Sequence, residues 1–227
     1  MTRTELRFQA SGSAGEVSAI LDRPDDARRL YVFAHGAGAG MRHRFMEAAA
    51  EALGAKGIAT FRYQFAYMEK RSRRPDPQPV LLATVRAAIA MARQATGDLP
   101  LLAGGKSMGG RMTSLASAEE PLEGVEGLVF FGFPLHPVGQ PGTKRADHLE
   151  RVAAPMLFLQ GTRDKLASLE LLEPIVTRLP RATLHVMDGA DHSFEVPKKT
   201  GRSLTDTLDD LAEAIARWAD TLEKERP

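Results

Sequence analysis

The sequence of 227 residues contains no cysteine. Disulfide bonds, thiolate metal sites and a cysteine nucleophile are therefore excluded. The chain also lacks an apolar run long enough to span a bilayer, and its first residues lack the apolar segment of a secretory signal, so we expect a cytoplasmic protein with no membrane partner. A net excess of charge is missing too, because 30 lysines and arginines stand against 29 aspartates and glutamates. Since no aromatic residues interleave the basic ones, we do not expect the chain to bind nucleic acid.

Apolar runs and helical patterns alternate along the chain, which is typical of βα units that build a mainly parallel sheet. The strands are expected near residues 4–10, 16–22, 30–35, 58–63, 99–104, 125–132, 155–160 and 182–188. The helices are expected near residues 43–56, 79–96, 107–118, 168–179 and 204–223. The first two strands have no helix between them, so they should form an antiparallel hairpin at one edge. The sequence thus predicts an α/β fold in a single domain, residues 1–227, with a sheet of eight or seven strands and helices on both faces.

Local signals refine the last two helices. Pro174 should disturb the helix at 168–179, because proline has no amide hydrogen to donate. Ser203 and Asp206 predict the cap of the final helix. That helix carries an apolar stripe, which favours docking on the core over a dimer seam and comprises Leu204, Leu208, Leu211, Ile215, Trp218 and Leu222. The segments 64–78 and 133–148 are expected to be irregular.

The stretch LLAGGKSMGGRM, residues 101–112, admits two interpretations. A phosphate-binding loop would need a glycine five positions before Gly105, where Pro100 stands, so that interpretation fails. The other fits at every position, because GKSMG, centred on Ser107, is a G-x-S-x-G motif between an apolar strand and a helical pattern. This motif exposes a nucleophilic serine on a sharp turn, where glycines avoid collisions with the neighbouring backbone.

A serine hydroxyl attacks only when a base removes its proton, so a histidine is needed, together with an acid that orients it. In a sheet of this kind the order along the chain is serine, acid, histidine, each after a later strand. Asp164 follows the expected strand at 155–160, and His192 follows the one at 182–188. Ser107, Asp164 and His192 are therefore the predicted catalytic residues.

Other residues compete for the roles of acid and base. Asp164 could instead cap the helix that follows it. Asp188 and Asp191 are rival acids, but they share a loop with His192 rather than following a different strand. Of the six histidines only His192 satisfies the order, the others being His35, His43, His136, His148 and His185.

The stretch FAHGAGAGMRHRF follows the expected strand at 30–35, where enzymes of this arrangement place one half of an oxyanion hole. Backbone amides serve there because they point rigidly at the oxygen that becomes negative. We assign the donors to Ala37 and Met108, with Gly38 as the alternative to Ala37. The helix after Ser107 also directs its amino end at the site, which favours negative charge.

On these residues the chain resembles an α/β-hydrolase of the dienelactone-hydrolase-like branch. Within it, the resemblance is greatest to the small family named for a testis-expressed protein and for a subunit of the nonspecific-lethal acetyltransferase complex. The stretches that carry it, within about residues 30–200, are FAHGAGAGMRH, FRYQFAYMEKRSRRPDPQPVL, GGKSMGGRM, LQGTRD and GADHSF. The resemblance implies a lidless α/β-hydrolase fold with a Ser107, Asp164, His192 triad. Dienelactone hydrolases use a cysteine nucleophile, so lactone specificity is not implied, and some relatives are parts of protein complexes rather than enzymes.

Caps of α/β-hydrolases usually enter after the sixth strand, where the segment 133–148 is too short for a cap domain. We therefore expect small or fairly polar acyl substrates, because a long lipid needs a pocket that shields it from water. The loops at the catalytic edge are rich in basic residues and contain few acids, so an anionic ester is one hypothesis and simply solvated loops the other. The basic residues are Arg42, Arg44, Lys70, Arg71, Arg73, Arg74, Lys144, Arg145, Lys198, Lys199 and Arg202. We expect substrate contacts from Gly36, Gly38, Arg71, Arg74 and His136. Lys106, next to Ser107, is expected either to add to this positive charge or to tie down a neighbouring loop.

The sequence thus predicts a carboxylesterase-like serine hydrolase that cleaves small esters or thioesters through an acyl-enzyme, with no metal or cofactor. Its partner would be a small-molecule ester, and the protein would be a monomer or a homodimer. The alternative is a non-catalytic interaction module that keeps the same scaffold.

Overall fold

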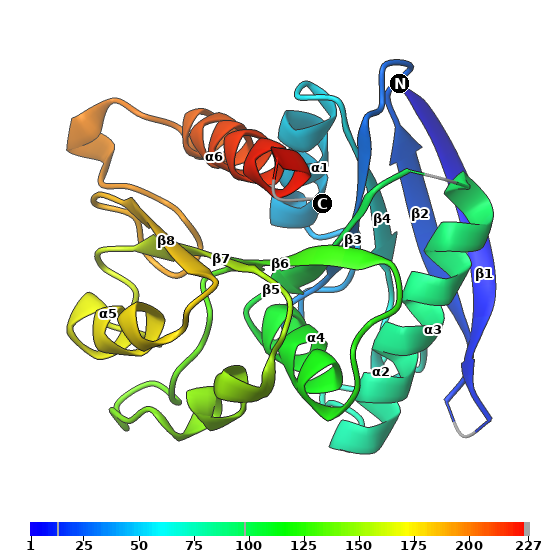
Figure 1. The fold of residues 1–227 in the computed structure, drawn as a ribbon, viewed down its shortest axis with the longest axis horizontal. Coiled ribbons are helices and arrows are strands. Elements are labelled where there is room, and N and C mark those ends of the chain that lie inside the picture. Colours follow the sequence, from blue (N-terminus) through cyan, green and yellow to red (C-terminus); the bar gives the residue numbers. More distant parts are fainter. Residues whose placement is uncertain (13, 98, 225–227) are drawn as a thin grey trace.

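The computed structural model describes residues 1–12, 14–97 and 99–224. Its centre is an eight-stranded sheet with the strand order β1-β2-β4-β3-β5-β6-β7-β8 (Figure 1). The strands are β1 (Thr2–Ser11), β2 (Gly15–Arg23), β3 (Arg29–Ala34), β4 (Ile58–Tyr63), β5 (Leu101–Lys106), β6 (Val125–Phe131), β7 (Met156–Gly161) and β8 (Ala182–Met187). β2 pairs antiparallel with both β1 and β4, whereas all other neighbours run parallel. The predicted eight-stranded, mainly parallel sheet and its edge hairpin are confirmed.

Helices cover both faces of this sheet, also as predicted. They are α1 (Arg44–Gly54), α2 (Ala66–Glu69), α3 (Gln78–Thr96), α4 (Met108–Glu119), α5 (Leu169–Arg178) and α6 (Leu204–Lys224), with the short 3₁₀ helices η1 (Lys144–Arg151) and η2 (Lys198–Thr200). α1 and α6 lie on one side of the sheet, and α3, α4 and α5 lie on the other (Figure 1). Each side has its own apolar core: Phe45 of α1 and Trp218 of α6 belong to one, Ile89 of α3 and Met112 of α4 to the other.

The two C-terminal helices follow most of their sequence signals. The amide and hydroxyl of Ser203 donate to Asp206, whose amide donates back to Ser203 Oγ, so the predicted cap of α6 is confirmed. Leu211 and Ile215 of the apolar stripe are fully buried against the core, as expected. Pro174, where a disturbance is expected, lies inside α5, which continues through this residue. The proline removes one amide donor from the helix, and that loss does not break it.

The connecting segments contain more structure than expected. The short helix α2 lies within 64–78, and η1 begins inside 133–148. Between β6 and β7, η1 is the one helix of the described residues, so no cap domain covers the sheet edge there. No helix in the described part of the chain is both long and apolar enough to cross a membrane.

Candidate active site

Ser107 lies on the turn between β5 and α4. Its backbone has φ = 51°, a left-handed conformation that is uncommon for a residue with a side chain. Its amide donates to the carbonyl of Phe131 on β6 at 3.0 Å, which holds the turn against the sheet. A Cβ atom at Gly105 or Gly109 would lie 2.4 or 2.5 Å from the carbonyl oxygen of Ala34 on β3. Only glycine allows this approach, and so the motif spacing follows from the packing of β5 and α4 on β3.

A chain of hydrogen bonds joins the three predicted catalytic residues. The Ser107 hydroxyl donates to His192 Nε2 at 2.9 Å, and His192 Nδ1 donates to Asp164 Oδ2 at 2.7 Å. Asp164 follows β7 and His192 follows β8, so residues far apart in the sequence meet at the carboxyl edge of the sheet. The distances are those at which a histidine can take the proton of a serine while a carboxylate fixes its tautomer.

Asp164 is held as a carboxylate. Burial disfavours its charge, but hydrogen bonds from His192, the Leu166 amide and the Gln160 side chain outweigh burial and keep the pKa of Asp164 below its usual value. The Leu166 amide donates at 2.7 Å and Gln160 Nε2 at 2.8 Å. The N-cap of α5 is Ser168, so Asp164 does not serve as the cap of that helix.

The rival acids have other partners. Asp191 Oδ1 accepts the amides of Ser193 and Glu195 and thereby shapes the turn around His192. Asp188 accepts the Thr162 hydroxyl at 3.4 Å, away from the His192 ring. The structure therefore brings Asp164, and neither rival, to the ring of His192.

The two residues assigned to the oxyanion hole, Ala37 and Met108, lie at the same cavity as Ser107 and next to it in the chain, respectively. Ala37 and Ser107 line the same cavity, and Met108 is the first residue of α4. The Gly38 amide donates to the Tyr67 hydroxyl at 3.1 Å, so it is engaged elsewhere. Among the hydrogen bonds of the described residues, none uses the amide of Ala37. This difference favours Ala37 over Gly38 as the donor.

His35 supports the loop that contains Ala37. Its Nδ1 donates to the carbonyl of Gly36 at 2.7 Å, and its Nε2 accepts the amide of Phe65 at 3.1 Å. Burial lowers the pKa of His35 to about 4, although the bond to Gly36 opposes this. At neutral pH His35 is thus an uncharged link between the ends of β3 and β4.

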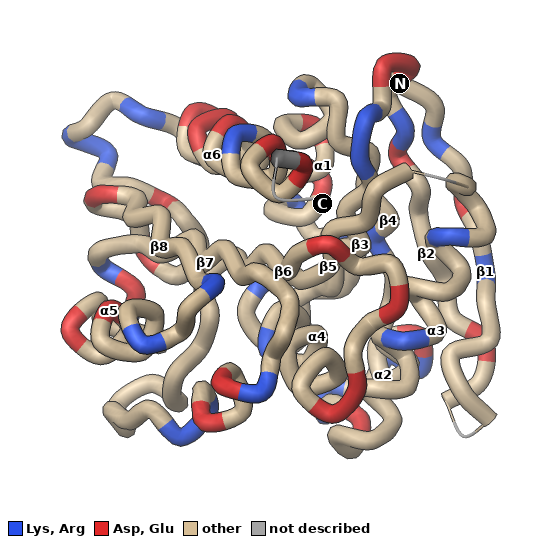
Figure 2. Tube along the Cα trace, in the orientation of Figure 1, with Lys and Arg blue, Asp and Glu red and all other residues tan. Residues whose placement is uncertain are grey.

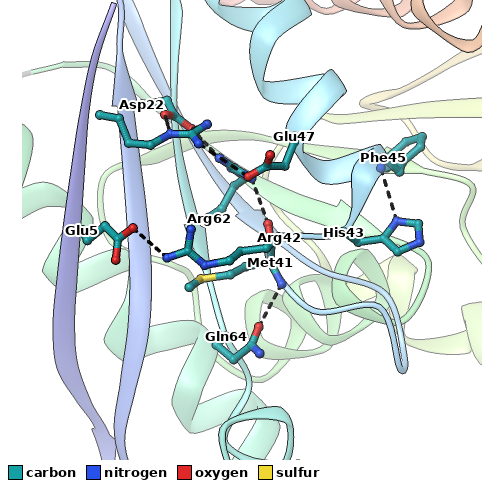
Figure 3. Close-up of polar contacts among 10 residues, drawn as sticks. Glu5, Asp22, Met41, Arg42, His43, Phe45, Glu47, Arg62 and Gln64 are labelled. Carbon is teal, nitrogen blue, oxygen red and sulfur yellow. Dashed lines mark hydrogen bonds and ion pairs between the residues drawn. The ribbon is translucent and has the colours of Figure 1, made fainter.

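The far end of the same loop is fixed by β4 (Figure 3). Arg62 Nη1 donates to the carbonyl of Met41 at 2.9 Å, and Gln64 Oε1 accepts the Met41 amide at 2.8 Å. His43 then begins α1, because its Nδ1 accepts the amide of Phe45 at 3.3 Å. The loop is therefore tied at both ends, through His35 and Met41, to β4 and to the residues that directly follow it.

The hydrogen-bonded residues open into a cavity of about 440 Å³. Its walls are Gly36, Ala37, Ala39, His43, Arg44, Phe45, Met46, Lys106, Ser107, Leu166, His192, Ser193, Glu195 and Leu204. Gly36 packs beside Ser107, the predicted nucleophile, since a Cβ atom there would lie 3.8 Å from Ser107 Cβ. Within the described part of the chain, Gly38, Arg71, Arg74 and His136 are not on these walls, so the structure does not bring them to the cavity. The His136 ring donates instead to the carbonyl of Pro137.

The basic residues expected around the site do not form one rim. Arg42 pairs with Glu5, Arg44 with Glu195 and Arg202 with Asp210, so the expectation of few compensating acids is wrong for these three. Glu5 lies on β1 and Asp210 on α6, so these acidic partners come from elements outside the basic loops, and the sequence did not identify them as partners. Figure 2 shows α2 and the basic segment between β8 and α6 on different sides of the view.

Two residues important to this geometry, Gly132 and Gln160, were missed by the sequence analysis, which also did not decide the role of Lys106. Gly132, with φ = 66°, packs on the hydrogen-bonded pair, because a Cβ atom there would lie 3.2 Å from His192 Nδ1 and 3.3 Å from Asp164 Oδ2. Gln160 supports Asp164, as described above. Lys106 donates from Nζ to the carbonyl of His192 at 2.6 Å. The position of Gly132 at the end of an expected strand was the available signal, whereas Gln160 has none.

No group of three or more histidines, aspartates or glutamates within the described ranges is arranged to hold a metal ion.

Comparisons with known proteins agree with this fold. Residues 27–220 match the family described as alpha/beta hydrolase domain, and the chain belongs to this family. Over 210 residues it is 30% identical to a Mycobacterium tuberculosis H37Rv protein with the provisional name phosphoribosyl transferase. The match covers 89% of this chain and 43% of that protein, so the chain spans less than half of the relative. The narrower resemblance to the testis-expressed and nonspecific-lethal-complex proteins stays a prediction.

Solved structures share the whole fold. Dienelactone hydrolase from Anabaena variabilis superposes with a TM-score of 0.74 at 24% identity, covering 96% of this chain and 97% of that one. A serine hydrolase homologue from Coxiella burnetii gives 0.73 at 20% identity, with 96% and 97% covered. A serine hydrolase without lid from Xanthomonas campestris gives 0.73 at 22%, with 96% and 95% covered. At these identities the likeness shows the fold alone.

Proposed function

We propose that this chain is a serine hydrolase that cleaves small carboxylic esters or thioesters through an acyl-enzyme. The observation that carries the proposal is the hydrogen-bonded series Ser107, His192, Asp164, with bonds of 2.9 and 2.7 Å, beside a cavity. Membership of the alpha/beta hydrolase family supports hydrolysis as the class of reaction.

The reaction would proceed in two steps. His192 Nε2 takes the proton of Ser107 as its Oγ forms a bond to the ester carbonyl carbon, and the carbonyl electrons move to the oxygen. The amides of Ala37 and Met108 donate to that oxyanion. The tetrahedral intermediate then expels the alcohol or thiol, which takes the proton from His192, and leaves an acyl-Ser107 ester. Water, deprotonated by the same histidine, releases the acid and restores Ser107, while Asp164 keeps the His192 ring oriented.

Small substrates are favoured by two features. The cavity volume of about 440 Å³ lies toward the low end of ligand pockets, and the residues that the structure describes form no cap that would shield a long apolar chain. Preference for an anionic ester stays a prediction, because Arg71 and Arg74 lie off the cavity walls and Arg44 is paired with Glu195. A comparison of kcat/KM for charged and neutral esters of equal size at low and high salt tests it; equal salt dependence would contradict it. A cytoplasmic location and a monomeric or homodimeric state also stay predictions.

A fluorophosphonate probe tests the proposed activity directly. We expect it to label the wild-type chain, and Ser107→Ala to abolish labelling and lower kcat by at least about 10³-fold with no loss of melting temperature. Thr162→Ala, which changes an exposed hydroxyl near the same sheet edge, should label normally. Folded wild-type protein that neither labels nor hydrolyses a panel of esters would favour a non-catalytic interaction module.

A further inference from the structure

Lys106 is the last residue of β5 and directly precedes Ser107. Only 9% of the residue is exposed, and its Nζ donates to the backbone carbonyl of His192 at 2.6 Å. The contact joins the strand of the nucleophile to the turn of the base, 86 positions apart in the chain. Two adjacent residues thus contact His192 at different points: Ser107 contacts its ring, and Lys106 contacts its backbone carbonyl.

Aromatic rings complete the surroundings of the Lys106 ammonium. Nζ lies 5.6 Å from the ring centres of both Phe45 and Phe194, which stack on each other at 6.0 Å. Within the described ranges, no carboxylate lies within ion-pair distance of Nζ. The Lys106 ammonium is therefore held by a carbonyl dipole and two aromatic ring faces. Both kinds of interaction weaken when the ammonium moves.

The turn around His192 is closed by hydrogen bonds within it and makes few polar contacts with β5. The Asp191 amide donates to the Glu195 carbonyl, and the Phe194 amide donates to the Asp191 carbonyl. The Arg163 amide ties the turn to the segment after β7 through the carbonyl of Ala190, and Glu195 reaches Arg44 of α1. Apart from the Ser107–His192 bond itself, Lys106 supplies the polar contact that the described structure places between this turn and β5.

We propose, on the basis of the function proposed above, that Lys106 is a positioning residue. Its ammonium holds the backbone of His192 so that Nε2 stays within hydrogen-bond reach of Ser107 while the ring accepts and returns the proton. A buried lysine without a carboxylate partner is costly to maintain, and such a cost is typical of functional sites rather than of structural ones.

Protonation of Lys106 should therefore affect the reaction. Burial lowers the pKa of Lys106 to about 8, against the opposing charges of Asp164 and Asp191. Those acids face it from the segments after β7 and β8. His192 and Glu195 also come from the segment after β8, and α1 contributes Arg44, the partner of Glu195, to the cavity walls. The neutral amine is a weaker donor to a carbonyl than the ammonium. The rate should decline as pH rises through the pKa of Lys106.

Variants at this position separate charge from packing. Lys106→Met keeps the apolar stem, and Lys106→Arg keeps both the donors and a charge that persists at alkaline pH. We expect kcat of Lys106→Met to fall by about 10- to 100-fold with little change in KM, because a small misplacement of the base slows proton transfer. Lys106→Arg should retain most of kcat and lose the alkaline decline. Lys165→Met, which removes an exposed lysine next to Asp164, is the matched control and should behave as wild type.

The measurements are kcat and KM for a small ester across neutral and alkaline pH, the rate of fluorophosphonate labelling, and the melting temperature. Wild-type kcat in Lys106→Met, or an alkaline decline that persists unchanged in Lys106→Arg, would overturn the role of Lys106. If Lys106→Met does not fold, the Lys106→Arg profile still decides.

An unlabelled, inactive wild type would instead count against the proposed function. The position of His192 is then read without turnover, from the proton NMR resonance of Nδ1–H in its bond to Asp164. That resonance should be sharp in wild type and broadened or lost in Lys106→Met. An identical resonance in both proteins would overturn the positioning role.

Discussion

Two buried cations, Arg62 on β4 and Lys106 on β5, are held in different ways. The Arg62 side chain is 0% exposed, and its guanidinium pairs with Asp22 at 2.6 Å and with Glu47 at 3.3 Å (Figure 3). The Lys106 ammonium has a carbonyl oxygen and two aromatic rings in place of carboxylates. The charge of Arg62 is therefore neutralised by carboxylates in direct contact, whereas the charge of Lys106 is not.

The difference indicates a structural role for Arg62 and a functional role for Lys106. Arg62 joins β2, β4, α1 and the loop at Met41, so its contacts hold elements together. Lys106 makes one such link, to the turn of His192, and its lowered pKa indicates that burial disfavours its charge. A destabilising group beside the proposed nucleophile Ser107 is better explained by a contribution to function than by a contribution to stability.

The largest effect on stability is expected at Arg62. Arg62→Met should lower the free energy of unfolding by about 3 kcal/mol, because it leaves the buried Asp22 with Arg3 alone and the Met41 carbonyl without this donor. Urea unfolding measures the change. Arg7→Met is the matched control on β1, since Arg7 pairs with Glu16 at 55% and 54% side-chain exposure and should cost less than about 1 kcal/mol. Equal losses in both variants would mean that burial of the Arg62 pairs contributes nothing.

Much of the fold could be predicted from the sequence, because the signals are local. Alternating apolar runs predict βα units, and the cap at Ser203 and Asp206 needs only neighbouring residues. Pairing of β2 with β4, which places Asp22 near Arg62, depends on contacts between distant segments. An arginine in an apolar strand carried no signal of its carboxylate partners, so this network was not predicted.

The site shows the same division. Ser107, Asp164 and His192 could be selected because the order of strands places the ends of β5, β7 and β8 at one edge. Side chains on long loops could not be placed in this way. Arg71 and Arg74 are off the cavity walls, and Lys106 was left open as either a source of charge or a tie to a neighbouring loop. The structure shows that the Lys106 side chain points to the His192 carbonyl, a contact that the sequence does not reveal.

A smaller effect of opposite sign is expected when the uncompensated cation is removed. Lys106→Met should raise the free energy of unfolding by about 1 to 2 kcal/mol at neutral pH, since the gain from not burying the charge exceeds the lost bond to the His192 carbonyl. The pKa of Lys106 is lowered from 10.5 to about 8. Between these values the unfolded chain binds a proton that the folded chain does not, so wild-type stability should rise with pH there and approach that of the variant.

Urea unfolding of both proteins below, within and above that range measures the difference. Lys165→Met, at an exposed lysine, should leave the slope with pH unchanged. A less stable Lys106→Met at every pH would mean that the ammonium stabilises the fold, and the contrast with Arg62 would fail.

The smallest effect concerns His35, which is buried without a carboxylate and gives up its charge altogether. Its pKa is lowered from 6.5 to about 4, so within this range the unfolded state binds the extra proton. Stability should therefore be lost as pH falls, by about 1 kcal/mol for the first pH unit below 6.5. His35→Gln should be less stable at neutral pH, because one amide cannot bridge Gly36 and Phe65 as the ring does, yet it should lose less stability on acidification.

His43→Gln, at an exposed position, is the control, and its free energy of unfolding should depend on pH as that of wild type does. If the stability of His35→Gln depends on pH as steeply as that of wild type, His35 is not neutral in the folded protein. Burial without a carboxylate partner would then lower the pKa of Lys106 but not that of His35.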